Sequence, residues 1–189
     1  MHECATDSER FELAVNFVLK HEGGYVNNPK DPGGATNYGV SLSFIKSMGI
    51  DVNLDGYIDA KDIEGLTKDN AKEIYKQYFW DPNNYHHIND IVLGSKFFDM
   101  CVNLGSVRAN KIVQKCINIL YPGALVVDGI LGPISLSYIN KAASEGFSPE
   151  LMIEVQKGCA MFYELLVDMH PDLIIFLKGW LARSYDEIS

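Results

Sequence analysis

The stretch His21-Glu22-Gly23-Gly24-Tyr25 lies where an apolar helical stripe ends and a glycine-rich loop begins. Reading back from Glu22, apolar residues recur every three or four positions, which is the spacing of one helix face: Val18, Val15 or Ala14, and Phe11. We therefore expect a helix that ends near residue 21 and packs this face into a core. Thr6, with Glu9 three positions later, predicts a capping box at the start of the helix.

Glu22 continues the apolar face, so its carboxyl group is expected beside packed apolar side chains. Burial disfavours a charged carboxylate, and a carboxyl group that stays neutral near neutral pH can serve as a general acid. The alternative is a solvated glutamate in the last helical turn. The residues that follow Glu22 favour the first interpretation.

A second acid and a hydroxyl follow in the Asn-, Pro-, Asp- and Gly-rich segment 25–40, which predicts a loop or short hairpin. In a glycosidase, one carboxyl protonates the leaving oxygen, and a second activates water or stabilises the oxocarbenium-like transition state. We expect Glu22 in the first role, Asp31 in the second, and Thr36 holding the water. The alternative for Asp31 is a turn-forming aspartate before proline. The candidate substrate-binding residues nearby are Tyr25, Asn37 and Tyr38.

Helical periodicity dominates the rest of the chain. Residues 88–104 are apolar nearly all round, which predicts a buried central helix, and amphipathic patterns predict further helices near 42–48, from 67 to before Asp81, and over 109–120, 133–143, 149–169 and up to 184. The expected fold is mainly α, with a small β-hairpin at the active-site cleft. We expect a catalytic lobe over 1–87 and a helical lobe over 88–189, packed as one integrated domain.

Composition and charge exclude several classes of protein. The net charge is −9, which argues against a nucleic-acid partner and against a basic membrane-binding surface. No run approaches the ~18 apolar residues of a membrane helix, and the polar N-terminus is unlike a secretory signal. The four cysteines lack zinc-ligand spacing; three lie on apolar helix stripes, where we expect free buried thiols, with a disulfide left open.

Residues 51–62 match the calcium-binding loop of an EF-hand. Oxygen-bearing side chains recur at the ligand positions, and Gly56 stands at the turn position. The predicted ligands of a structural Ca²⁺ are Asp51, Asn53, Asp55, Asp62 and the backbone carbonyl of Tyr57. The last ligand is Asp instead of the usual Glu, and the alternative is a metal-free, Asp-rich turn. No cofactor is expected in the chemistry itself.

The segment 21–41 (HEGGYVNNPKDPGGATNYGVS) resembles the signature of glycoside hydrolase family 108, the bacterial and prophage N-acetylmuramidases also called secretion activator proteins. The resemblance continues over 75–82, over 97–105 with Gln114, and over 176–183, the second of these resembling the start of a peptidoglycan-associated region. Val127–Pro133 resembles a turn of peptidoglycan-binding modules, although it also reads as an ordinary helix connection. Essentially the whole chain is covered.

The resemblance implies a lysozyme-like fold and cleavage of the β-1,4 bond between N-acetylmuramic acid and N-acetylglucosamine, with Glu22 as the acid. The phage lysozyme pattern Glu-x8-Asp-x5-Thr fits through Asp31, but Thr36 is one position early and Asn37 holds the expected place. The alternatives are a lytic transglycosylase and a non-catalytic calcium- or cell-wall-binding protein. We expect a monomer that acts on glycan strands in the periplasm or cell wall, after synthesis in a bacterial or phage-infected cytoplasm.

Overall fold

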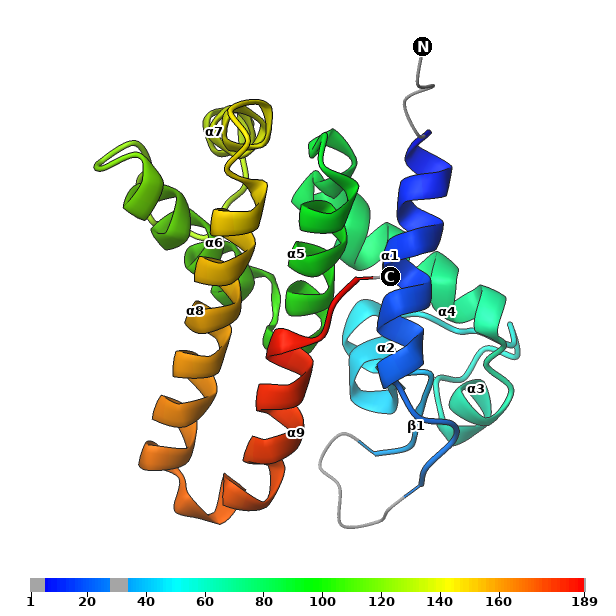
Figure 1. The fold of residues 1–189 in the computed structure, drawn as a ribbon. Helices are drawn as coiled ribbons and strands as arrows, with labels where there is room; N and C mark the ends of the chain where they lie inside the picture. The colour runs from blue at the N-terminus through cyan, green and yellow to red at the C-terminus, as the bar shows by residue number, and fades with distance from the viewer. Residues whose placement is uncertain (1–5, 28–33, 189) are drawn as a thin grey trace.

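The computed structural model describes residues 6–27 and 34–188, and this part of the chain is mainly helical, as predicted (Figure 1). The larger elements are α1 (Asp7–His21), β1 (Thr36–Asn37), β2 (Val40–Ser41), α2 (Leu42–Met48), α3 (Ala60–Glu64), α4 (Lys68–Tyr75), α5 (Ile91–Leu104), α6 (Ser106–Leu120), α7 (Pro133–Ser144), α8 (Ser148–Met169) and α9 (Ile174–Tyr185). Single turns η1 (Lys76–Trp80), η2 (Asp81–Asn83) and η3 (Tyr85–His87) join α4 to α5, and η4 (Pro171–Leu173) joins α8 to α9. Within the described residues, no helix is both long and apolar enough to cross a bilayer.

The first helix begins and ends where the sequence predicts. The Thr6 hydroxyl accepts a bond from the Glu9 amide, and the Glu9 carboxylate accepts one from the Thr6 amide, which completes the capping box. The helix ends at His21. The Glu22 amide still donates to the Val18 carbonyl at 3.2 Å, but the backbone of Glu22 is already extended. Glu22 is therefore the first residue beyond the helix.

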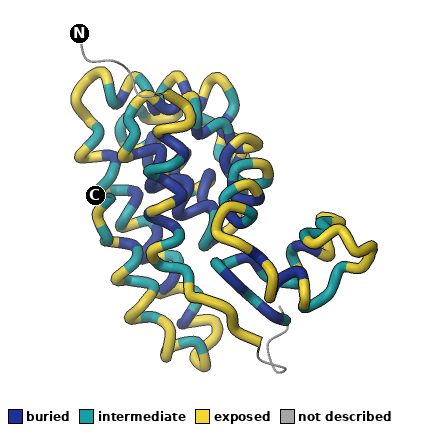
Figure 2. The backbone as a smooth tube through the Cα atoms, turned by 90° about the vertical axis from the view of Figure 1, so that its right-hand side faces the viewer, coloured by how far each residue is buried: buried dark blue, intermediate teal, exposed yellow. Residues whose placement is uncertain are grey.

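Helix α5 is the buried centre of the molecule, as predicted from its apolar sequence. Helices α1 and α6 both pack against it, and Figure 2 shows buried residues running through the middle of the helical bundle. Phe98 lies at the centre of an aromatic cluster and contacts four other rings edge-on: Phe11, Tyr75, Trp80 and Tyr85. The apolar core contains residues from both predicted lobes, and the division of the chain near residue 87 stays a prediction.

The predicted hairpin is present but is shorter than the segment 25–40. Its strands pair Thr36 with Ser41 and Asn37 with Val40, antiparallel, and Thr36 also bridges to Val26. The two turn residues, Tyr38 and Gly39, both have positive φ, at 49° and 76°. Two such residues match the twist of a tight hairpin, so the turn requires a backbone that glycine adopts easily.

Three cysteines are free and buried, which confirms the prediction for them: Cys101, Cys116 and Cys159. Burial raises the pKa of Cys101 to about 11 and the pKa values of Cys116 and Cys159 to about 12. Because the thiolate is the reactive form, these thiols should react very slowly in the folded protein. Cys4 lies outside the described residues.

We expect a Cys4→Ser variant to show almost no reaction with an aromatic disulfide reagent at neutral pH. After urea has unfolded the protein, the three remaining thiols should react at the rate of an exposed cysteine in a peptide. Rapid labelling of any thiol without denaturant would contradict the burial of these side chains.

Candidate active site

Glu22 lies in a surface pocket of about 410 Å³ at the end of α1. Its side chain is only 18% exposed, so the carboxyl group is largely withdrawn from water but reaches the pocket. The pocket is lined by residues of α1, the glycine pair, the hairpin turn and the start of α4: Asn16, Leu19, Lys20, Glu22, Gly23, Gly24, Tyr38 and Lys68. A partly buried acid in a concave surface is the arrangement that the sequence predicts.

The hairpin turn packs directly against Glu22. The Tyr38 amide donates to the Gly23 carbonyl at 3.2 Å, and the Tyr75 hydroxyl donates to the Tyr38 carbonyl at 2.9 Å. A Cβ atom on Gly39 would overlap the Tyr75 hydroxyl and would lie 2.7 Å from Glu22 Oε2. Burial and the nearby charge of Glu22 raise the pKa of Tyr75, so its hydroxyl stays neutral and remains a donor. Glycine at position 39 therefore leaves the space that one carboxylate oxygen of Glu22 occupies.

The other oxygen of Glu22 forms an ion pair that the sequence analysis missed. Arg183 Nη1 lies 3.0 Å from Glu22 Oε1, and Arg183 Nε and Nη2 donate to Asp99 Oδ1 at 3.1 and 2.8 Å. The Arg183 and Asp99 side chains are 15% and 3% exposed. Burial alone would lower the pKa of Arg183, but the Asp99 and Glu22 carboxylates outweigh it and raise the pKa, so the guanidinium stays charged. The expectation that the Glu22 carboxyl lies only among apolar side chains is therefore wrong, because its Oε1 is paired with a guanidinium.

The sequence did contain a signal for part of this network. Lys96 and Asp99 are the two charged residues of α5, a helix that is otherwise apolar or uncharged. A charge inside a buried helix is costly unless it is paired, so each of them implies a partner from another element. Nothing in local periodicity points to Arg183, which is 84 residues beyond Asp99.

Lys96 holds the end of α9. Its ammonium group donates to the backbone carbonyls of Arg183 and Asp186 at 2.9 and 3.3 Å, and its side chain is buried. Burial lowers the pKa of Lys96, while the Asp99 carboxylate acts in the opposite direction. The Asp186 carboxylate lies 3.0 Å from His21 Nε2 on α1. The last turn of α9 is therefore tied to α5, and Asp186, the residue that follows α9, is tied to both α5 and α1.

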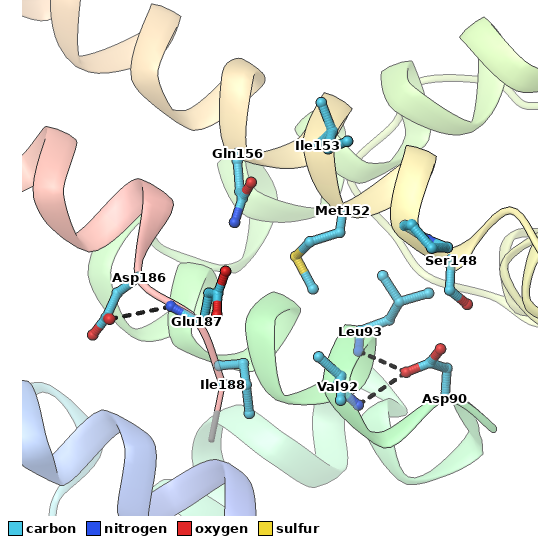
Figure 3. A pocket seen from close by; sticks show the side chains of 11 residues that line it. Asp90, Val92, Leu93, Ser148, Met152, Ile153, Gln156, Asp186, Glu187 and Ile188 are labelled. Atoms are coloured by element: carbon cyan, nitrogen blue, oxygen red, sulfur yellow. Dashed lines mark hydrogen bonds between the residues drawn. The ribbon is translucent and has the colours of Figure 1, made fainter.

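The chain beyond α9 lines a second cavity, of about 430 Å³, between the starts of α5 and α8 (Figure 3). Its lining combines apolar side chains such as Met152 and Ile153 with the carboxylates of Asp90, Asp186 and Glu187. Asp90 accepts from the Val92 and Leu93 amides and caps α5, as the dashed lines in Figure 3 show. This cavity is separate from the pocket that contains Glu22.

The other candidate site residues differ in where they lie relative to the Glu22 pocket. Tyr38 lines the Glu22 pocket, whereas Tyr25 is 42% exposed and Thr36 lies in β1; neither is among the described residues lining it. Asn37 is buried, and its amide group donates to the Ile63 and Leu66 carbonyls, so its side chain is committed to packing the hairpin on α3. Asp31 lies outside the described residues. The catalytic and binding roles of all these residues stay predictions.

The loop 51–62 adopts a set of tight turns built by its predicted ligands. Asp51 Oδ2 accepts from the Gly56 amide, Asn53 Oδ1 from the Asp55 amide, and Asp55 Oδ1 from the Tyr57 amide, all at 2.8–2.9 Å. Gly56 has a φ of +89°, as a sharp turn requires. These bonds leave Asp51 Oδ1 buried without a partner in the described part of the chain.

Asp62, the last predicted calcium ligand, is fully buried and faces the backbone. Its two oxygens accept from the amides of Val52, Asn53 and Asp59. Burial opposes ionisation, but these bonds outweigh it and lower the pKa of Asp62. Over residues 6–27 and 34–188, no three His, Cys, Asp or Glu side chains are grouped to hold a metal ion. The orphaned oxygen of Asp51 suits a cation, and the full ligand set stays a prediction.

Comparisons with known proteins show a similarity for the part of the chain that contains Glu22. Residues 15–105 match the model of a protein family described as Glycosyl hydrolase 108. A solved structure titled "Structure of Brucella abortus SagA" is 28% identical, with a TM-score of 0.53, and the match covers 93% of this chain and 96% of that one. No curated protein matches the chain. Residues 15–105, which contain Glu22, the hairpin and Asp99, are therefore similar to the glycosyl hydrolase 108 family.

Proposed function

We propose that this glycoside hydrolase is an N-acetylmuramidase that cleaves the β-1,4 bond between N-acetylmuramic acid and N-acetylglucosamine in peptidoglycan. One observation carries the proposal: Glu22 lies partly buried in a surface pocket, with Oε1 paired to Arg183 and Oε2 beside Gly39 of the hairpin turn. A fixed carboxyl group at the edge of a pocket has the geometry that a general acid needs. We further propose that the enzyme acts as a monomer on glycan strands of the cell wall, after release or export.

In the proposed reaction, a glycan strand lies in the pocket beside Tyr38 and Glu22 donates its proton to the glycosidic oxygen. The bond from that oxygen to the anomeric carbon breaks, and positive charge develops on the sugar ring. Water then adds to the anomeric carbon and gives up a proton. We assign Asp31 to receive that proton or to stabilise the ring charge, with Thr36 orienting the water. The products are two shorter glycans, one of which has a new reducing end.

Mass spectrometry of digested peptidoglycan tests this proposal. Hydrolysis adds one water molecule per cleaved bond and leaves a reducing N-acetylmuramic acid, which borohydride converts to the alcohol. Products that end in an anhydro-sugar and contain no added water would show that the enzyme is a lytic transglycosylase and not a hydrolase. If purified peptidoglycan yields no soluble fragments, the proposed enzymatic activity is wrong, and the alternative of a non-catalytic cell-wall-binding protein is favoured.

We also propose that loop 51–62 holds a structural Ca²⁺, with Asp51, Asn53, Asp55, Asp62 and the Tyr57 carbonyl as ligands. The support is the loop sequence, the turn at Gly56 and the buried oxygen of Asp51 that has no partner in the described residues. Hard cations such as Ca²⁺ bind oxygen ligands of this kind. The ion would neutralise carboxylates within the catalytic lobe and take no part in the chemistry.

Chelation should therefore lower the melting temperature. If free Ca²⁺ exceeds Kd by about 100-fold, binding contributes about 2.7 kcal/mol, which for a chain of this size corresponds to a shift of roughly 5–10 °C. Differential scanning fluorimetry with excess chelator, followed by added Ca²⁺, measures the shift. Asp55→Asn keeps an oxygen for the Tyr57 amide but removes a charge, so it should weaken the response, whereas Asp168→Asn on the exposed face of α8 should not. A melting temperature that does not change when the chelator is added would refute the calcium site.

A further inference from the structure

We propose that Arg183, itself held by Asp99, is a positioning residue for Glu22, so that α9 completes an active site whose acid directly follows α1. This inference rests on the proposed function. Arg183 lies 161 positions after Glu22 and beyond residues 15–105, the part of the chain that matches the family model. The C-terminal helix would then be part of the catalytic machinery in addition to its role in the core.

The geometry of the guanidinium group carries the proposal. Two of its N–H donors, on Nε and Nη2, bind the same oxygen of Asp99, and the third nitrogen, Nη1, binds Glu22. Because a guanidinium is a rigid planar fork, the two bonds to Asp99 set the direction in which Nη1 points. Asp99 is itself buried on the central helix. Arg183 thus fixes Glu22 relative to the buried centre of the molecule.

The backbone that carries Arg183 is held from two further sides. Lys96 donates to the Arg183 carbonyl itself, at 2.9 Å. One turn earlier on α9, the Trp180 ring stacks on Tyr163 of α8, with centroids 5.0 Å apart and planes inclined by 21°. Both Lys96 and Tyr163 are buried. The position of the Arg183 side chain is therefore set before any substrate binds.

The charge of Arg183 acts on the proton transfer. When Glu22 gives its proton to the glycosidic oxygen, a carboxylate remains, and a guanidinium 3.0 Å from Oε1 stabilises that negative charge. The ion pair is already formed without substrate, and Arg183 is not among the described residues that line the pocket, so its removal should affect the proton transfer and change kcat more than KM. A residue that only supports the fold would instead change stability and leave the kinetics of the folded enzyme unchanged.

Three variants test the inference through rates on soluble peptidoglycan fragments: Arg183→Lys, Arg183→Met and, as a control on the exposed face of α9, Lys178→Met. Loss of precise alignment costs on the order of 10²-fold in rate. We expect Arg183→Met to lower kcat by about that factor and Arg183→Lys, which keeps the charge but loses the fork, by roughly 10-fold, because a lysine cannot bind two carboxylates in the same geometry. KM should change little, and Lys178→Met should behave like the wild type.

The Glu22→Gln background separates positioning of the acid from a general effect on the protein. Residues that act as a unit give non-additive losses, so Arg183→Lys should cause no further loss in a chain that already lacks the acid. Asp99→Asn, which keeps an acceptor for Arg183, provides a second route should Arg183→Met fail to fold, and it should also lower kcat with KM retained.

The outcomes separate this inference from the function on which it rests. If the wild type releases fragments but folded Arg183→Lys and Asp99→Asn keep the wild-type kcat, the positioning role is overturned and the hydrolase stands. A lower melting temperature with unchanged kcat also overturns the positioning role, since it assigns Arg183 to the fold alone. A wild type that releases nothing overturns the proposed function and this inference together.

Discussion

A Glu22→Gln variant will fold as the wild type does and will release fragments from peptidoglycan about 10²–10⁴-fold more slowly. Glutamine has almost the same shape and keeps an oxygen for Arg183, but it has no proton to donate to the leaving oxygen. General acid catalysis contributes about 10²–10⁴-fold to rates, so the loss should lie in that range. Turbidity of a peptidoglycan suspension and mass spectrometry of the supernatant measure it.

The matched control for this variant is Glu12→Gln on α1, the helix that precedes Glu22. Glu12 pairs with Lys72 one helical turn before Asn16 and does not line the pocket, so the change removes one carboxylate and one partly exposed ion pair. Such pairs contribute about 0–1 kcal/mol, and activity should persist. Wild-type rates in Glu22→Gln would remove Glu22 from the mechanism, whichever way the control behaves.

A Gly39→Ala variant will lose both stability and activity. The residue has a φ of +76°, and an added Cβ would overlap the Tyr75 hydroxyl and approach Glu22 Oε2 to 2.7 Å. A left-handed backbone costs an alanine about 1–2 kcal/mol, and overpacking adds about 1–3 kcal/mol. Because Glu22 has to move to admit the methyl group, kcat should fall on the order of 10²-fold.

Gly49→Ala separates the strain from the steric contact. Gly49 ends α2 with a similar φ of +68°, and a Cβ there would have no atom within 4 Å. Urea unfolding should show a loss of about 1–2 kcal/mol for Gly49→Ala with full activity, and a larger loss for Gly39→Ala. Equal stabilities and equal rates for the two variants would mean that the turn does not hold Glu22 in place.

Local patterns predicted those parts of the molecule that depend on near neighbours in sequence. The capping box at Thr6, the end of α1 before Glu22 and the buried character of α5 all follow from residues within one or two turns of each other. The hairpin was recognisable from its turn-forming composition, although its strands cover only Thr36–Asn37 and Val40–Ser41. Periodicity of this kind is set by backbone geometry, so it can be recognised in the sequence without knowledge of the tertiary structure.

Asn37 shows where that reasoning ends. Its position in a strand of two residues does not determine which side faces the pocket, because one shift in register reverses the two faces. Packing against α3 determines which way the side chain faces: the Asn37 side-chain amide donates hydrogen bonds to the Ile63 and Leu66 carbonyls. A residue that was expected to bind substrate therefore lies buried beneath the hairpin.

The sequence by itself determined that an acid, Glu22, follows an apolar helix and precedes a glycine-rich turn, and that a buried helix carries Lys96 and Asp99. Only the tertiary structure decided that Arg183 binds Glu22 and Asp99 together. The reason is physical: helix and strand periods relate residues a few positions apart, whereas an ion pair between residues 22 and 183 depends on how α1, α5 and α9 pack. Long-range packing places the charge that completes the site.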